Sequence, residues 1–370
     1  MEFTVKRSQL LDELNLVQGV IEKKSTIPIL SNILLESSGD RLNITATDLD
    51  VSICCGCAAV VSDPGTMTVP ARRLFEIARY LPEEAEIHCT LLENDWLGVR
   101  SGNSEYKVVG LPKENFPSVP QPAAPGVQIS GAVLKAMIQR TIFAITQEES
   151  RYSLNGAMLL VKPQEMRMVA TDGHRLAVVS QTVDVSGLDT ELKALIPRKT
   201  LIEVQKLIGD RDLTLEFGRD ENHLFFSLAD KRLVSRVLAG QFPNYEMVIP
   251  RANDKMVLAS TKALADGIRR AQVMSDERLR AVRLSFKPNA VEITASSAEA
   301  GEARDVVPVE YSAAGMDIGF NPQYLLDFLS VCGSESVNLA LRDSETQGMF
   351  RPAGDSKDLQ YTYVVMPMKF

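Results

Sequence analysis

The sequence predicts an α+β protein built as three tandem copies of one domain. Three observations support this prediction: a strand pair that recurs at a fixed offset, a helix that follows a proline-containing turn, and an earlier amphipathic helix in each copy. The 370 residues, 45% of them hydrophobic, are enough for several domains that each have a core. A repeat of this length determines the architecture of the whole chain.

The strand pair is the clearest repeat. Leu35, Leu159 and Leu284 occupy matching positions, separated by 124 and 125 residues. The strand that follows each leucine alternates apolar and polar residues, which indicates one buried face. The three matching strands read Leu42-x-Ile44-x-Ala46-Thr47-Asp48, Met166-x-Met168-x-Ala170-Thr171-Asp172 and Val291-x-Ile293-x-Ala295-Ser296-Ser297.

Two helices are predicted in each copy. One is opened by a proline, because the amide of a first-turn residue has no partner within the helix; it follows Val69-Pro70, Ile196-Pro197 and Asn321-Pro322. An earlier helix is expected at about 7–20, 131–145 and 261–274, with Ser130 and Ser260 as caps. The copies divide as domains 1–120, 126–246 and 247–370, with a proline-rich linker between the first two.

Composition and cysteine spacing exclude several classes of protein. The chain lacks a run of eighteen apolar residues and begins without the apolar stretch of a signal peptide, so we expect a cytoplasmic protein without a membrane partner. Cys54, Cys55 and Cys57 crowd one strand-like segment, where neighbouring side chains point to opposite faces. Buried thiols are therefore favoured over a metal site, and we expect no metal and no cofactor.

Cations recur on the proline-opened helices. Arg72 and Arg79 in the first copy match Lys199 and Lys206 in the second, each pair seven residues apart and therefore on one helix face. On a single helix such a pair indicates only a solvated face, whereas its recurrence predicts a positive surface in a chain of net charge −8. A surface of this kind favours sequence-independent contacts with phosphates.

The segment Thr171-Asp172-Gly173-His174-Arg175-Leu176 is the densest in reactive groups. In an enzyme, His174 oriented by Asp172 would be a general base. The sequence shows no phosphate loop and no metal-binding motif to accompany it. We therefore favour a turn whose side chains line a binding site and predict no catalytic residue, with catalysis at this turn as the alternative.

Motifs along the whole chain point to one family. They are Phe3-Thr4-Val5, Pro28-Ile29-Leu30, Thr47-Asp48-Leu49, Val69-Pro70-Ala71-Arg72, Arg151-Tyr152, Leu154-Asn155-Gly156, Phe242-Pro243 and the C-terminal Tyr363-Val364-Val365-Met366-Pro367-Met368-Lys369-Phe370. With these motifs and the repeat, the chain resembles the beta-subunit family of bacterial DNA polymerase III, the sliding clamps. The resemblance implies three DNA-clamp domains with helices on the inner face and antiparallel sheets outside, and a head-to-tail homodimer that closes a six-domain ring.

The resemblance also implies a function and partners. A clamp is a non-catalytic processivity factor in DNA replication that encircles double-stranded DNA. It tethers the DNA polymerase III alpha subunit, the clamp loader and other proteins with a clamp-binding motif through a peptide pocket. A monomeric adaptor that binds peptides but not DNA is the remaining alternative.

Matched by motif, the resemblance assigns residues to three sites. The peptide pocket would comprise Arg151, Leu154, Thr171, Gly173, His174, Arg175, Leu176, Pro243, Met247, Val248, Asn321, Tyr324, Val364, Val365, Met366, Pro367 and Met368. DNA would contact Lys24, Arg72, Arg73, Arg79, Tyr152, Lys199 and Lys206, of which Arg79 and Lys206 come from the helix spacing. The dimer interface would place Arg100, Tyr106, Lys107 and Val108 against Val273, Met274, Glu299 and Glu302. Met247 stands where the best-known members have an arginine, so the peptide preference is expected to differ.

Overall fold

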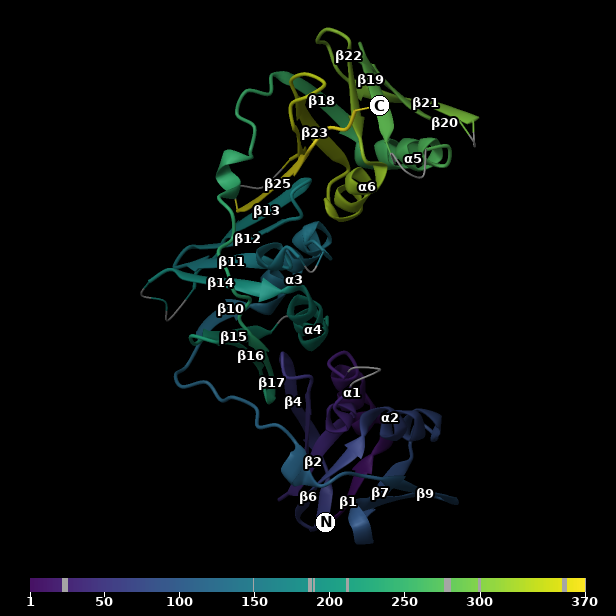
Figure 1. Cartoon of the computed structure of the whole chain (residues 1–370), viewed down its shortest axis with the longest axis vertical. Helices are drawn as coiled ribbons and strands as arrows, with labels where there is room; N and C mark the ends of the chain where they lie inside the picture. The colour runs from purple at the N-terminus through teal and green to yellow at the C-terminus, as the bar shows by residue number, and fades with distance from the viewer. Residues whose placement is uncertain are drawn as a thin grey trace. The chain divides into compact units, whose positions relative to one another are not determined.

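The computed structural model describes residues 1–21, 26–148, 150–185, 188, 190–210, 213–275, 281–298, 301–354 and 358–369. Contacts divide the chain into two units, which are Met1–Lys135 with Lys199–Val237, and Ala136–Arg198 with Leu238–Phe370. Figure 1 shows their helices and strands along the chain. Within the described ranges, no helix has the length and apolar character needed to span a membrane.

Two antiparallel sheets form the first unit. The smaller has the order β5 (Val60–Asp63), β1 (Glu2–Lys6), β7 (Glu86–Leu91), β8 (Trp96–Ser101) and β9 (Ser104–Val109). The larger has the order β10 (Val127–Ser130), β15 (Thr214–Arg219), β16 (His223–Leu228), β17 (Lys231–Arg236), β4 (Val51–Ala58), β3 (Arg41–Thr47), β2 (Asn32–Ser38) and β6 (Gly65–Pro70). Strands β10 and β15 to β17 come from the second copy of the repeat, and they extend the sheet of the first copy through the pair β17 and β4.

One sheet of twelve strands runs through the second unit. Its order is β14 (Leu192–Pro197), β11 (Gly156–Lys162), β12 (Glu165–Thr171), β13 (Arg175–Thr182), β25 (Leu359–Val365), β24 (Gly348–Pro352), β23 (Ser336–Leu341), β18 (Lys255–Ser260), β21 (Gly301–Glu310), β20 (Ala290–Ser297), β19 (Val282–Lys287) and β22 (Met316–Phe320). Here β13 of the second copy pairs antiparallel with β25 of the third. The recurring strand pairs of the sequence are β2 with β3, β11 with β12 and β19 with β20.

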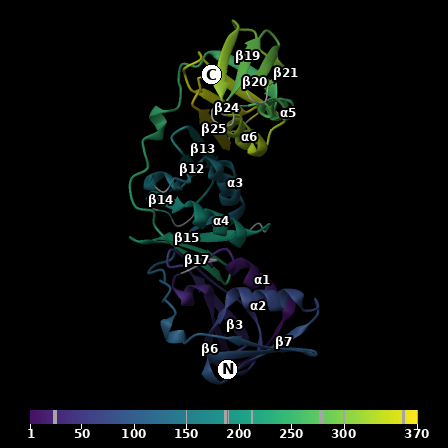
Figure 2. The same cartoon turned by 45° about the vertical axis from the view of Figure 1, so that its right-hand side comes forward.

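Each copy contributes two helices. They are α1 (Arg7–Val17), α2 (Ala71–Tyr80), α3 (Gly131–Thr141), α4 (Arg198–Ile208), α5 (Thr261–Gln272) and α6 (Pro322–Val331). Short 3-10 turns lie at η1 (Pro28–Ser31), η2 (Glu93–Asp95), η3 (Lys113–Asn115), η4 (Ile142–Ala144), η5 (Tyr152–Leu154) and η6 (Tyr245–Met247). The helices α1 and α2 lie side by side, and so do α5 and α6 (Figures 1 and 2).

Contacts at the helix ends explain how α1 and α2 fit together. Leu10 and Leu14 fall on one face of α1 and are fully buried. Ahead of them, the Arg7 guanidinium donates hydrogen bonds of 2.9 Å to the carbonyls of Ala78 and Arg79. These carbonyls end α2 and have no partner within the helix, so Arg7 satisfies them.

The structure corrects two details of the predicted helices. Pro70 and Pro197 end the preceding strands β6 and β14, and only Pro322 lies inside a helical first turn. Proline has no amide to donate to a strand pair, and it is tolerated here because β6 and β14 are edge strands of their sheets. The earlier helices also end sooner than expected, at Val17, Thr141 and Gln272. The predicted cap Ser260 does accept a hydrogen bond from the Ala263 amide.

An aromatic cluster forms the core where the second and third copies meet. The ring of Phe328 stacks on Tyr363 with centroids 5.0 Å apart, and it lies 5.1 Å from the ring of Tyr361. Both tyrosines are fully buried, and each hydroxyl donates to a backbone carbonyl, that of Arg140 from Tyr361 and that of Tyr324 from Tyr363. Each buried hydroxyl thus has a partner, as burial in an apolar core requires.

Candidate functional site

Side chains close the turn between β12 and β13. The Asp172 carboxylate accepts hydrogen bonds from the amides of His174 and Arg175 at 2.9 and 3.0 Å. The Thr171 hydroxyl accepts from the Gly173 amide and donates to the Arg175 carbonyl. Gly173 has a φ of +90°, a backbone conformation that residues other than glycine rarely adopt. The residues that looked chemically dense in the sequence therefore build a rigid turn.

Arg175 anchors this turn to two other elements. Its guanidinium bonds to Asp172 at 2.9 Å and to Asp327 of α6 at 2.5 Å, and it also donates to the Phe143 carbonyl. It lies 4.3 Å from the centre of the Tyr324 ring. Burial alone would lower the pKa of Arg175, but its contacts with Tyr363, Asp327 and Asp172 raise it above the usual range. The residue is permanently charged and serves to hold the turn in place.

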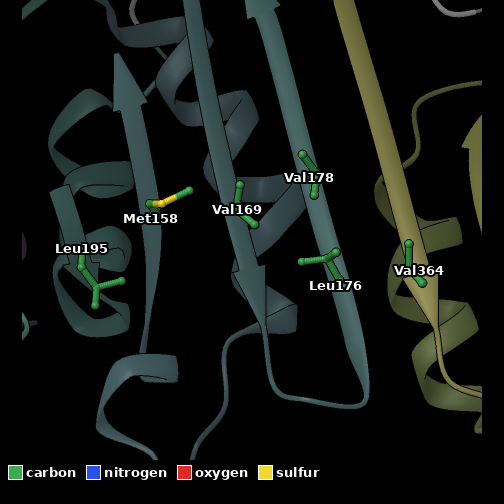
Figure 3. Close-up of a cluster of buried hydrophobic side chains, with 6 residues drawn as sticks. All are labelled: Met158, Val169, Leu176, Val178, Leu195 and Val364. Atoms are coloured by element: carbon green, nitrogen blue, oxygen red, sulfur yellow. The ribbon is translucent and has the colours of Figure 1, made fainter. Parts of the chain in front are cut away.

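Beside the turn lies an apolar cluster made of Met158, Val169, Leu176, Val178, Leu195 and Val364. Figure 3 shows these side chains on neighbouring strands of one sheet. Val169 and Val178 are directly opposite each other, and so are Leu176 and Val364. We call the side of the sheet that bears this cluster the pocket face.

A cavity of about 280 Å³ opens at the end of the cluster, and we call it the Leu176 pocket. The turn forms one wall, and the chain segment after β17 forms another, where Phe242, Tyr245 and Ile249 pack against the cluster. The lining is mostly apolar, with a few polar groups from the turn, which is the usual make-up of a site for an apolar peptide. Its residues are Leu154, Thr171, Gly173, His174, Arg175, Leu176, Pro243, Asn244, Tyr245, Val248, Val364 and Met366.

Most residues assigned to the pocket from sequence thus line one cavity, whereas others lie beside it. Arg151 donates to the Asp172 carbonyl at 3.0 Å and braces the turn from outside. Asn321 caps α6 by accepting from the Gln323 amide. Tyr324 lies under Arg175.

Four further assigned residues do not line the cavity. Val365 is fully buried on the other side of β25, because successive strand residues point to opposite faces. Met247 is 82% exposed, and Met368 forms a bridge with Gly319. Pro367 stands between the lining residue Met366 and that bridge.

Sequence reasoning missed Asn244 and Tyr245. Both follow the Phe242-Pro243 motif, and an aromatic residue in a linker was the available signal. Tyr245 packs its ring 6.5 Å from that of Phe242, and its hydroxyl bonds to Arg167 at 3.1 Å.

The predicted cations of the first copy lie exposed on α2. Arg72 and Arg73 are both more than 70% exposed and share one carboxylate, Glu76, at 3.1 and 3.4 Å. With Arg79 they line a hollow of about 730 Å³. Three guanidiniums around one carboxylate leave this hollow positively charged.

The predicted cations of the second copy have an additional role. Lys199 pairs with the buried carboxylate of Asp48, and Lys206 pairs at 2.8 Å with the buried carboxylate of Glu203. An unpaired buried carboxylate is costly, so both lysines stabilise the fold. Tyr152 is 71% exposed, and Lys24 lies outside the described residues.

The described residues assigned to the dimer interface lie on β8 and β9 in the first copy, and after α5 and on β21 in the third. Arg100 pairs with Glu105 at 2.9 Å across β8 and β9, and Tyr106 and Lys107 are exposed on β9 while Val108 faces the core. In the third copy, Val273 is 71% exposed just after α5, followed by the half-buried Met274, and Glu302 is exposed on β21. Glu299 lies outside the described residues.

Four of the five cysteines are buried thiols. Burial raises the pKa of Cys89 to about 12, and burial together with the nearby Glu13 carboxylate raises that of Cys57 to about 12. Cys54 is only partly buried and faces away from Cys55 and Cys57. In the described part of the chain, His, Cys, Asp and Glu residues form no cluster that could hold a metal ion.

Family models match almost the entire chain. They are the N-terminal domain of the DNA polymerase III beta subunit at residues 1–120, its central domain at 128–244 and its C-terminal domain at 246–369. The chain is also similar to the beta sliding clamps of Pseudomonas aeruginosa and Escherichia coli. It is 37% identical to each, with full coverage of both chains in each comparison.

Solved structures agree with these matches. The DNA polymerase III subunit beta from Pseudomonas aeruginosa superposes with a TM-score of 0.93 at 36% identity, over all of both chains. The sliding clamp from Bartonella birtlesii bound to griselimycin superposes with a TM-score of 0.94 at 33% identity, also over all of both chains.

Proposed function

Because the chain belongs to the DNA polymerase III beta subunit family, we propose that two copies form a ring around double-stranded DNA and bind replication proteins through the Leu176 pocket. The family is a non-catalytic accessory subunit, so the protein is a sliding clamp and not an enzyme. The proposed partners are the DNA polymerase III alpha subunit, the clamp loader and other proteins with a clamp-binding motif, all in the cytoplasm. Domains 1–120, 126–246 and 247–370 are the proposed repeating units.

The observation that best supports the ring is the way in which the copies are joined. The fourth strand of copy one, β4, pairs antiparallel with the last strand of copy two, β17. The fourth strand of copy two, β13, pairs in the same way with the last strand of copy three, β25. The equivalent strands that have no such partner within the described chain are β21 of copy three and β9 of copy one. If β21 of each protomer pairs with β9 of its partner, the two resulting interfaces close a head-to-tail ring.

Both strands have an open edge in the described structure. β9 is the terminal strand of its sheet, and Gly301–Pro308 of β21 pair along one side only, with β20. Exposed charges on both strands are the usual protection of an edge that must not pair at random. Lys107 on β9 and Glu302 on β21 have opposite charges, which favours pairing between these two edges.

Within such a ring, the α2 hollow provides cations for DNA. The three arginines of that hollow can contact phosphates without reading bases. Binding of this kind is weak and salt-sensitive by itself, so a stable association depends on closure of the ring.

A topological link predicts a specific pattern of release from DNA. The protein, loaded with a clamp loader and ATP onto a nicked circular plasmid, is expected to stay bound in high salt because a closed ring cannot leave a circle. Linearising the same plasmid should release most of it within minutes by sliding off the ends. Gel filtration separates DNA-bound from free protein and so measures both the retention on circles and the release from linear DNA. A plasmid that is cut after deproteinisation is the control for the linearisation step. Retention on linear DNA, or loss from circles in high salt, would contradict the ring.

A charge in the Leu176 pocket is expected to weaken peptide binding. Val248 is 40% exposed and lines the pocket, so Val248→Asp should leave the fold intact while it places an unpaired carboxylate against apolar ligand groups. We expect binding to weaken on the order of 10-fold or more, measured by fluorescence polarisation of a labelled Leu-Leu-Phe peptide. Met256→Asp, at an exposed methionine outside the pocket, is the matched control. Equal loss in both variants would rule out this pocket as the peptide site.

A further inference from the structure

Beyond the Leu176 pocket, the pocket face changes from apolar to polar. Moving away from the pocket, the next residue on this face of β12 after Val169 is Arg167. On the antiparallel strand β13, the next residue after Val178 is Ser180. Arg167 and Ser180 are directly opposite each other, as are the two valines. The change therefore occurs at the same level on both strands.

The neighbouring strands also change from apolar to polar, one step closer to the Leu176 pocket, because Thr362 of β25 is directly opposite Val178. On β25, Thr362 succeeds Val364, and on β24, Arg351 succeeds Met349. Met349 is directly opposite Val364, so both belong to the pocket face. The Arg351 guanidinium donates to the Thr362 hydroxyl at 3.1 Å. A polar strip thus crosses four strands beside the apolar cluster.

A second hollow of about 280 Å³ lies over this strip, and we call it the arginine shelf. Its charged residues are Arg167, Arg251, Arg351 and Glu246. Tyr245 lines both the shelf and the Leu176 pocket, and its hydroxyl bonds to Arg167. The two hollows therefore share a wall, and a chain bound in one can continue into the other.

The shelf has an excess of positive charge. Arg167 is held at 2.7 Å by Glu165 and lies 3.8 Å from Glu246. Arg251 and Arg351 are exposed, and neither forms an ion pair with any residue that the structure describes. Three guanidiniums face two carboxylates, in a protein whose net charge is −8. Two arginines are thus available to a ligand.

We propose that the arginine shelf binds acidic side chains that flank the apolar motif of a partner peptide seated in the Leu176 pocket. This inference rests on the proposed function of that pocket. The planar guanidinium group matches a carboxylate with two parallel hydrogen bonds, so Asp and Glu are the residues that the shelf selects. Because the pocket itself is apolar, the shelf would discriminate among partners that share the same apolar motif.

Three labelled peptides test the shelf directly. Each contains the sequence Leu-Leu-Phe, extended at both ends by two Asp, two Asn or two Lys residues, and fluorescence polarisation measures its affinity for the intact protein. We expect the Asp peptide to bind several-fold more tightly than the Asn peptide and the Lys peptide to bind most weakly. Arg251→Gln and Arg351→Gln should each reduce the advantage of Asp over Asn by about 2- to 5-fold, as is typical of an exposed charge pair.

The outcomes separate the shelf from the pocket. Arg219→Gln removes the same charge from an exposed position on β15 and should leave all affinities unchanged. Equal binding of the Asp and Asn peptides, or an Asp advantage that survives in the Arg251→Gln, Arg351→Gln double variant, would overturn the shelf and leave the pocket intact. If the Asn peptide fails to bind the unmodified protein, the proposed function of the pocket fails, and the shelf fails with it.

Discussion

Replacement of Val273 by Asp is expected to turn the ring-forming dimer into a monomer. Val273 is 71% exposed in the single chain and is followed by the half-buried Met274, the other apolar residue assigned to this side of the interface. In the proposed ring it meets the β9 edge of the other protomer, where an aspartate carboxylate would lose its hydration in place of an apolar contact. The cost corresponds to a dimer weakened on the order of 100-fold, measured by sedimentation velocity across a concentration series.

Val60→Asp provides the matched control for this variant. Val60 is 72% exposed on β5, at the opposite edge of the sheet that ends in β9. The same substitution there should leave dimerisation and thermal stability unchanged. If the Val273→Asp protein sediments as the unmodified protein does, Val273 is not part of the interface, and the case for head-to-tail closure is weakened.

The second large effect is expected from Arg175→Ala. The side chain is 10% exposed and joins Asp172, Asp327 and the Phe143 carbonyl, so its loss leaves two largely buried carboxylates without a counter-ion. Breaking a buried network in this way typically costs about 3–5 kcal/mol in the free energy of unfolding. Urea denaturation followed by circular dichroism measures the loss. Peptide binding should fail as well, because the turn forms a wall of the Leu176 pocket.

A conservative variant separates charge from geometry at this position. Arg175→Lys keeps the positive charge but cannot reach Asp172, Asp327 and the carbonyl together, so we expect a smaller but clear loss of stability. His174→Ala, at the neighbouring exposed side chain, should cost little because the His174 contacts in the turn are made by its backbone. A loss below about 1 kcal/mol for Arg175→Ala would contradict the role given to this network.

The repeat was predictable from sequence, but the divergence of its surfaces was visible only in the register of the strands. The position of the opposed valines Val169 and Val178 in copy two corresponds to Thr45 opposite Cys54 in copy one. In copy three it corresponds to Thr294 opposite Arg304. Copy two therefore has an apolar face at this place, and the other two copies do not.

Copy three has replaced the apolar surface with an ionic one. There, Glu292 bonds to Arg304 at 2.9 Å and to Lys287 at 3.0 Å. The hydrogen bonds from Arg304 and Lys287 lower the pKa of Glu292 to about 2. A face covered by such ion pairs offers little to an apolar peptide, which explains in physical terms why the copies are not equivalent as peptide sites.

Patterns of short range were sufficient for much of this protein. Alternation along a strand and spacing along a helix depend on neighbouring residues, so the repeated strand pairs, the two helices per copy and the exposed cations of α2 followed from the chain itself. The motifs around Phe242-Pro243 and Thr171–Leu176 likewise pointed to one binding surface.

Partners distant in sequence were decided only by the folded structure. Arg175 meets Asp327, 152 residues away, and Lys199 meets Asp48, 151 residues away. Residues with the same local pattern therefore differ in role: the arginines of α2 remain largely exposed, whereas the matching lysines of α4 neutralise buried carboxylates. Charge can be counted along a chain, but its effect depends on which groups burial brings within hydrogen-bonding distance, and tertiary packing alone determines that.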